Sequence, residues 1–317
     1  MPLGLRRGVV SSIGERHERL VRLEVDGIAC VAYPRLTGEV EVGDDVLVNE
    51  QARLLELGSG GFDVLYANLT RGLGLGGEEG AHVMALPYTP GQVALSHKEE
   101  SDPLAIGLAG MPVVCCTLHS QVAPVCAGLA GLRVAYVQLM GGALPVSLSD
   151  TLRELAKRGL IDVAAAVAPC FDGDAQFVTV AAALAWAKEQ DYQAVVCSVG
   201  PGIVGTGTPL GHGALSLADA ANVASALGGR PVLAVRTSAA DPRDRHRGVS
   251  HHTQAVLELC LGEIAVPDDS NGEGWEDACR GLPLSHMGRG PEDDPGFFRA
   301  AYAAGVVARS LVEGSAR

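Results

Sequence analysis

The feature that most constrains the fold is a change in the hydrophobic period near Met111. Beyond this residue, short continuous apolar runs alternate with stretches whose apolar residues recur at helical spacing. Such runs are typical of strands that are covered on both faces. Strands and helices repeated in this way build a parallel sheet with right-handed crossovers. The sequence therefore predicts a Rossmann-like α/β domain over residues 111–266, with strands at 113–118, 133–139, 162–168, 194–199, 231–236 and 263–266.

The first 70 residues follow a different pattern, in which β-rich runs are short and are separated by glycine turns. Asp26-Gly27 is a strong hairpin signal, because glycine tolerates the left-handed backbone of a tight turn. We expect a small OB-like β-barrel with strands at 8–13, 20–25, 28–33, 45–49 and 52–57. Such barrels often bind nucleic acid, but this segment lacks the aromatic clusters and basic stripe that stacking requires. A structural or docking role is the expected one.

Three further segments complete the predicted organisation. Residues 71–110 are rich in glycine and then acidic, and are expected to connect the two domains. Residues 267–296 are polar and are expected to be flexible. Residues 297–317 form a helical pattern that could dock on its own domain or on a second subunit, which leaves a homo-oligomer open.

Charge and cysteine content narrow the classes of function. With 37 acidic and 24 basic side chains the net charge is -13, which repels nucleic acids and anionic membranes. An anionic ligand would therefore need a local basic patch. No apolar run has the length of a membrane span or a signal peptide, and the eight cysteines form no C-x-x-C pair. We expect reduced cysteines and a cytoplasmic protein that binds neither nucleic acid nor membrane.

The loops that follow the strands are where a ligand is expected, because open parallel sheets bind ligands beyond the carboxyl ends of their strands. One of these loops, residues 200–208, is rich in glycine and can point several backbone N–H groups at an anion. It also matches the dinucleotide fingerprint formally. We give that match little weight, since the helix does not begin at the third glycine and the next strand ends in Arg236 instead of an acid. Close packing is the alternative reason for the glycines. The residues proposed to bind the anion here are Gly200, Gly202, Gly205, Thr206, Gly207 and Thr208.

The next loop, 241–253, is the clearest basic cluster. Ser250 is a good N-cap, so His251 and His252 should lie in the first helical turn, where the helix dipole disfavours imidazolium. Neutral imidazoles can transfer a proton, donate to an anion or bind a metal. If the segment is extended, its alternating arginines share one side and form a fork for an anion. The predicted ligand residues are Arg243, Arg245, His246 and Arg247, and the predicted acid/base residues are His251 and His252, oriented by Asp241 or Asp244.

Two alternatives remain open at these loops. Asp241 and Asp244 could instead pair with the arginines in a solvated network, with the histidines serving only as caps. His119, at the end of the first strand of the sheet, could face the histidines as a catalytic group or metal ligand, although a single histidine is more often structural. A metal version of the site would use His119, His251, His252 and an aspartate, as for zinc or iron. The spacing diagnoses no metal or cofactor.

Several of these strings resemble a bacterial family known only as a domain of unknown function. They are 200–208 (GPGIVGTGT), 241–253 (DPRDRHRGVSHHT), 118–121 (LHSQ) and 141–145 (GGALP). The resemblance covers residues 1–265, and it implies no activity that can be transferred to this chain. It also implies a segment at 168–178 richer in His, Gly and Glu than the one present here.

The preferred hypothesis is an enzyme acting on a small anionic molecule, phosphorylated or carboxylated. A hydrolase, a lyase or a transferase would fit. The alternative is a non-catalytic sensor of a metabolite or nucleotide, and a dinucleotide-dependent oxidoreductase comes third. The two leading hypotheses place the ligand at the same edge of the sheet.

Overall fold

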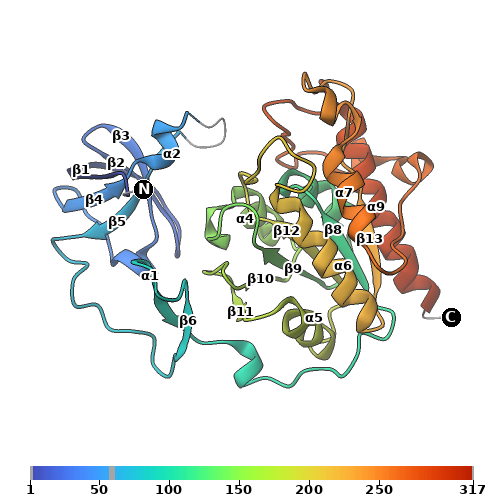
Figure 1. The fold of residues 1–317 in the computed structure, drawn as a ribbon, viewed down its shortest axis with the longest axis horizontal. Helices are drawn as coiled ribbons and strands as arrows, with labels where there is room; N and C mark the ends of the chain where they lie inside the picture. Colours follow the sequence, from blue (N-terminus) through green and yellow to red (C-terminus); the bar gives the residue numbers. More distant parts are fainter. Residues whose placement is uncertain (1–2, 57–60, 316–317) are drawn as a thin grey trace. The chain divides into compact units, whose positions relative to one another are not determined.

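The computed structural model describes residues 3–56 and 61–315. The chain divides into two compact units, Met1–Leu95 and Ser96–Arg317, whose elements are labelled in Figure 1. The first unit contains a closed barrel, and the second contains a parallel sheet flanked by helices. The predicted order, a small β-barrel followed by a Rossmann-like α/β sheet, is confirmed.

The barrel closes in the order β1-β2-β3-β5-β4. Asp26 and Gly27, both with positive φ, join β2 to β3 in the predicted hairpin. The strands are β1 (Leu5–Arg16), β2 (Val21–Val25), β3 (Ile28–Ala32), β4 (Asp45–Asn49) and β5 (Asp63–Asn68), with helix α1 (Pro34–Thr37) before β4. A separate hairpin, β6 (Val83–Ala85) and β7 (Val93–Leu95), follows.

The fifth strand predicted for the barrel, 52–57, is wrong for residues 52–56. Residue 57 lies outside the described residues. Gln51–Leu54 is helix α2, and Leu54 and Leu55 are both exposed. β5 takes the place instead, pairing parallel to β3 and antiparallel to β4. Consecutive exposed leucines do not alternate between core and solvent, so this run cannot supply an inward face to the barrel.

The second unit is built on a parallel sheet with strand order β11-β10-β9-β12-β8-β13. Its strands are β8 (Pro112–Cys116), β9 (Val134–Leu139), β10 (Val163–Val167), β11 (Ala175–Phe177), β12 (Ala194–Val199) and β13 (Arg230–Ala234). Five of them match predicted strands. The predicted strand at 263–266 forms only a bridge, in which Ala265 pairs with Val232 of β13. The three-residue strand β11 was not predicted, because so short a run has no detectable period.

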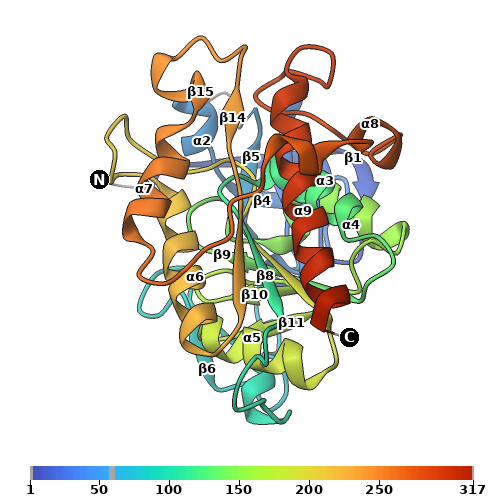
Figure 2. The ribbon, with the colours of Figure 1, turned by 90° about the vertical axis from the view of Figure 1, so that its right-hand side faces the viewer.

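Helices cover both faces of this sheet, as Figure 2 shows. On one face lie α3 (Val122–Gly128), α4 (Asp150–Lys157) and α9 (Pro295–Ser315); on the other lie α5 (Val180–Glu189), α6 (Ser216–Ala226) and α7 (His251–Leu259). The N-cap of α4 is Ser149, whose side chain accepts from the backbone N–H of Leu152. Helix α4 therefore begins at Asp150, directly after its cap.

The C-terminal helix docks on its own unit. A Cβ added to Gly305 of α9 would lie 2.2 Å from the Val125 carbonyl of α3, so the two helix backbones approach closely. Before α9 the chain forms helix α8 (Trp275–Ala278), and Trp275 and Cys279 are buried against Phe297 and Phe298.

The short strands β14 (Thr237–Ser238) and β15 (Gly248–Val249) pair ahead of α7. The 3-10 turns are Lys98–Glu100, His119–Gln121, Val146–Leu148, Gly213–Leu215, Asp244–His246 and Asp269–Gly272.

Within the described residues, no helix has the length and apolar character needed to cross a membrane.

Candidate active site

The connections around β8 create a switch point at the carboxyl edge of the sheet. β8 leads into α3 on one face, whereas its two neighbours β12 and β13 lead into α6 and α7 on the other face. Loops that leave adjacent strands in opposite directions open the position where α/β sheets usually bind ligands. The loops after β12 and β13 flank this position.

The glycine loop after β12 folds back on itself. The backbone N–H of Val204 donates to the Gly141 carbonyl at 2.8 Å, and that of Thr206 donates to the Gly211 carbonyl at 2.6 Å. A Cβ on Gly200 would lie 2.1 Å from the Ala143 carbonyl, so this glycine is required for close packing. Part of the loop is thus explained by packing, and the predicted anion cradle stays a prediction.

The loop also brings a histidine to the edge of the sheet. Gly205 forms a β-bridge with His212, which lies just before α6. The rings of His212 and His252 stack with centroids 3.9 Å apart and planes inclined by 23°. His251 lies beside both, with ring centroids 5.3 Å from His212 and 4.5 Å from His252. His246 joins the group, 4.8 Å from His251 and 5.0 Å from His252. We call His212, His246, His251 and His252 the histidine cluster.

Ser250 contacts two members of the histidine cluster, His246 and His252. Its hydroxyl caps α7 by accepting from the backbone N–H of His252 at 3.2 Å, as predicted, and lies 2.7 Å from Nδ1 of His246. Two successive helical residues usually point in different directions. Here both His251 and His252, in the first turn of α7, enter the cluster, and their ring planes are inclined by 61° to each other.

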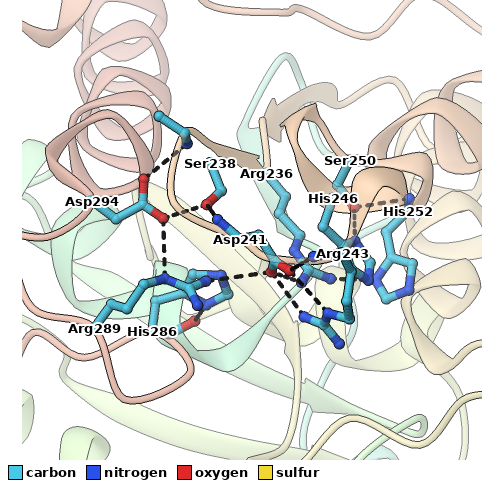
Figure 3. A network of polar contacts seen from close by, with 12 residues as sticks. Arg236, Ser238, Asp241, Arg243, His246, Ser250, His252, His286, Arg289 and Asp294 are labelled. Carbon is cyan, nitrogen blue, oxygen red and sulfur yellow. Dashed lines mark hydrogen bonds and ion pairs between the residues drawn. The ribbon is translucent and has the colours of Figure 1, made fainter.

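Behind the histidine cluster lies a buried charged network, drawn in Figure 3. Asp241 is fully buried, and its carboxylate accepts two hydrogen bonds from the Arg243 guanidinium, at 2.9 and 2.8 Å. Arg289 and Arg236 lie 3.3 and 3.8 Å from the same carboxylate. Asp294, also fully buried, accepts from the hydroxyl of Ser238 and lies 3.5 Å from Arg289.

Arg236 links this network to the histidine cluster. It is 2% exposed, and its Nη1 lies 2.9 Å from Nδ1 of His252. Burial lowers the pKa of Arg236 to about 10, which leaves the guanidinium charged at neutral pH. An arginine only donates hydrogen bonds, so Nδ1 of His252 must be the acceptor.

All four imidazoles are held neutral. Burial, with a smaller contribution from Arg236, lowers the pKa of His252 to about 2 and that of His246 to about 3. Burial also lowers the pKa of His251, helped by the neighbouring His212 and Arg245. The pKa of His212 is lowered by burial and, more weakly, by Arg236, against an opposing effect of the Pro209 carbonyl.

The predicted arginine fork does not form. Asp244–His246 is a 3-10 turn, so the segment is not extended and its arginines do not share one side. Arg243 is occupied by Asp241, and Arg247 lies 3.8 Å from the exposed Asp244. Arg245 is exposed and meets the glycine loop: a Cβ on Gly207 would lie 4.0 Å from its guanidinium. The solvated-network alternative therefore describes Arg247 and Asp244, but not Arg245.

The two predicted orienting aspartates do not contact the imidazoles through any hydrogen bond in the described part of the chain. Asp241 binds arginines, and the Asp244 side chain is 97% exposed. The groups that orient the rings are Arg236 and Ser250 instead.

His119 occupies a separate buried network. Its Nε2 lies 2.6 Å from the Ser149 hydroxyl, and its Nδ1 lies 3.3 Å from the Val199 carbonyl and 3.4 Å from the Tyr136 hydroxyl. Burial lowers its pKa to about 4. These partners tie the end of β8 to β9, β12 and the cap of α4, and none of them belongs to the histidine cluster.

Three residues of the histidine cluster could hold a metal ion. One nitrogen from each of His212, His251 and His252 lies within 4.8 Å of the others. His212 was not among the predicted site residues. Its place at the end of a glycine loop and directly before a helix was a usable signal, because that is the same edge of the sheet as His251 and His252.

The fold and its polar edge define a two-unit α/β protein with histidines and arginines gathered at the carboxyl ends of a parallel sheet. The chain belongs to the family described as "Protein of unknown function (DUF3866)", whose model matches residues 29–273. The histidine cluster lies within the matched region, whereas Arg289 and Asp294 of the charged network follow it. No curated protein matches the chain.

Proposed function

We propose that the protein is an enzyme that acts on a small anionic molecule at the edge formed by the loops after β12 and β13. One observation carries the proposal: four neutral imidazoles lie in ring contact beside Arg236, Arg243 and Arg245. A neutral imidazole has a lone pair that can accept a proton, which is what a general base requires.

The charge of the site favours an anion. Asp241 and Asp294 compensate only part of the positive charge of Arg236, Arg243 and Arg289, and Arg245 has no ion pair within 4.0 Å among the described residues. In a chain of net charge -13, this is a local positive region that attracts an anionic substrate.

The roles follow from these positions. Arg245 and the tip of the glycine loop at Gly207 and Thr208 bind the anion. His251 transfers the proton, because Arg236 occupies Nδ1 of His252, and burial together with Arg236 lowers the pKa of His252. A hydrolase, a lyase or a transferase fits this arrangement. The glycine loop runs to the 3-10 turn at Gly213 before α6 begins, which offers no support for a dinucleotide fingerprint. The eight free cysteines, seven of them buried, suit a cytoplasmic enzyme.

The test is a thermal-shift and turnover screen of the full chain against phosphorylated and carboxylated metabolites. Ligands that stabilise the wild type should stabilise Arg245→Gln much less. Arg247→Gln is the matched control, since it removes the same charge from the same loop at a side chain that is 60% exposed and paired with Asp244. His251→Ala and His252→Ala should abolish turnover.

Two outcomes would contradict the proposal. Ligand stabilisation that survives loss of both histidines, without turnover in the wild type, would indicate the non-catalytic sensor. A wild type that no anion stabilises would exclude an anion site altogether.

A further inference from the structure

The histidine cluster holds buried nitrogens that have no hydrogen-bond partner of regular geometry among the described residues, and the Pro209 carbonyl is the one protein group that acts on the His212 ring as an acceptor. Both ring nitrogens of His212, which is 7% exposed, and Nε2 of His251 are buried without a hydrogen-bond partner of regular geometry. Buried polar atoms are normally paired, and leaving one unpaired costs about 1–3 kcal/mol. Unpaired nitrogens on adjacent rings therefore mark the position of a ligand.

We propose that His212, His251, His252 and Arg245 bind the phosphoryl group of a phosphorylated substrate, an assignment that rests on the proposed function and names its substrate class. Nitrogens of the three rings lie within 4.8 Å of one another, so a single phosphoryl group can reach all of them. Arg245 approaches from the glycine loop side.

Arg236 determines what His252 offers to this ligand. Because the guanidinium donates to Nδ1 at 2.9 Å, the single proton of the neutral ring must lie on Nε2. Nε2 is then a hydrogen-bond donor. A donor suits an oxyanion, whereas a metal ion needs a lone pair on the same nitrogen.

The stacking of two rings favours an oxyanion over a metal ion as the ligand. A metal lies in the plane of each imidazole that ligates it, about 2.0–2.1 Å from the nitrogen. The His212 and His252 rings stack at 3.9 Å with an inclination of only 23°, so their planes do not meet at such a distance. A phosphoryl group presents several oxygens and can accept from each ring separately.

The number and charge of the donors favour phosphate over carboxylate. Three rings and one guanidinium surround the position, and a phosphoryl group has three strongly accepting oxygens, whereas a carboxylate has two. The rings of His251 and His252 also belong to the first turn of the nine-residue helix α7, where the helix dipole favours negative charge.

The experiment measures binding of inorganic phosphate to the purified full chain by calorimetry, together with its metal content. We expect one phosphate per chain. His251→Phe keeps a ring but removes the donor, and Arg245→Gln removes the charge; each should weaken phosphate binding at least tenfold, and His251→Gln should restore part of it. His82→Phe is the control, because His82 is exposed and lies in the other unit. The melting temperature without ligand establishes that each variant is folded.

Other results would overturn the assignment. Phosphate binding that is unchanged in folded His251→Phe would place the phosphoryl group elsewhere. One tightly bound transition metal per chain, lost in the same variant, would make the cluster a metal site. If carboxylated metabolites bind in an Arg245-dependent way and phosphate does not, the phosphoryl assignment fails while the anionic-substrate proposal stands. If no anion binds the wild type, both fail.

Discussion

The Nη1 atom of Arg236 lies 2.9 Å from Nδ1 of His252, so a buried guanidinium sets the position of the proton on a ring of the histidine cluster. Most hydrogen bonds between arginine and its neighbours involve carboxylates or carbonyls. Here the acceptor is a neutral imidazole, and the charge of Arg236 is part of the reason that this ring does not take a second proton.

Replacing Arg236 by lysine should no longer fix the proton of His252 on Nε2. Lysine keeps the charge but lacks the planar fork that reaches both His252 and Asp241. We expect His252 to populate both neutral tautomers and the protein to lose about 1–3 kcal/mol of stability. Histidine nitrogen shifts measured by NMR report the tautomer, and urea unfolding reports the stability. A His252 that stays entirely protonated on Nε2 in the variant would contradict this account.

Asp241 should be far more important for stability than Asp244. Asp241→Asn removes the buried carboxylate that Arg236, Arg243 and Arg289 share, and only Arg289 keeps another one, at Asp294; we expect a loss of about 3–5 kcal/mol. Asp244→Asn changes an almost fully exposed side chain and should alter stability by less than about 0.5 kcal/mol. Equal effects in urea unfolding would show that the buried network is not what stabilises this loop.

Two glycines of the same loop should respond differently to a methyl group. In Gly200→Ala the new Cβ would lie 2.1 Å from the Ala143 carbonyl, so the two loops must move apart at a cost of about 1–3 kcal/mol. In Gly207→Ala the nearest atom is 4.0 Å away, and no destabilisation is expected. Thermal unfolding of both variants tests the comparison, and a tolerated Gly200→Ala would remove the packing explanation.

His119 should make the protein less stable in mild acid. Its pKa is lowered to about 4 by burial, whereas in the unfolded chain it is about 6.5. Between these values the unfolded chain binds the proton and the folded protein does not, so stability is lost as the pH falls from 6.5 to 4. The expected loss from this residue is about 3 kcal/mol. His119→Gln should flatten the pH dependence of unfolding, and His82→Gln should leave it unchanged; identical slopes in wild type and His119→Gln would contradict the assignment.

The architecture was determined largely by local sequence. Continuous apolar runs predicted five of the six sheet strands, and Asp26-Gly27 placed a hairpin, because period and turn chemistry are properties of neighbouring residues. The barrel strand predicted at 52–57 is wrong because its consecutive exposed leucines do not alternate, and β11 was missed because a run of three residues shows no detectable period.

The candidate site also combines features that local sequence determines with contacts that only the tertiary structure determines. The sequence by itself brought His251 and His252 into the first turn of a helix capped by Ser250, since a cap and a turn are local features. Only the tertiary structure decided that His212 completes the cluster, that His119 belongs to another network and that Arg236 holds His252. These contacts join residues 16 to 80 positions apart, and they form because the parallel sheet brings the ends of β8, β12 and β13 to one edge.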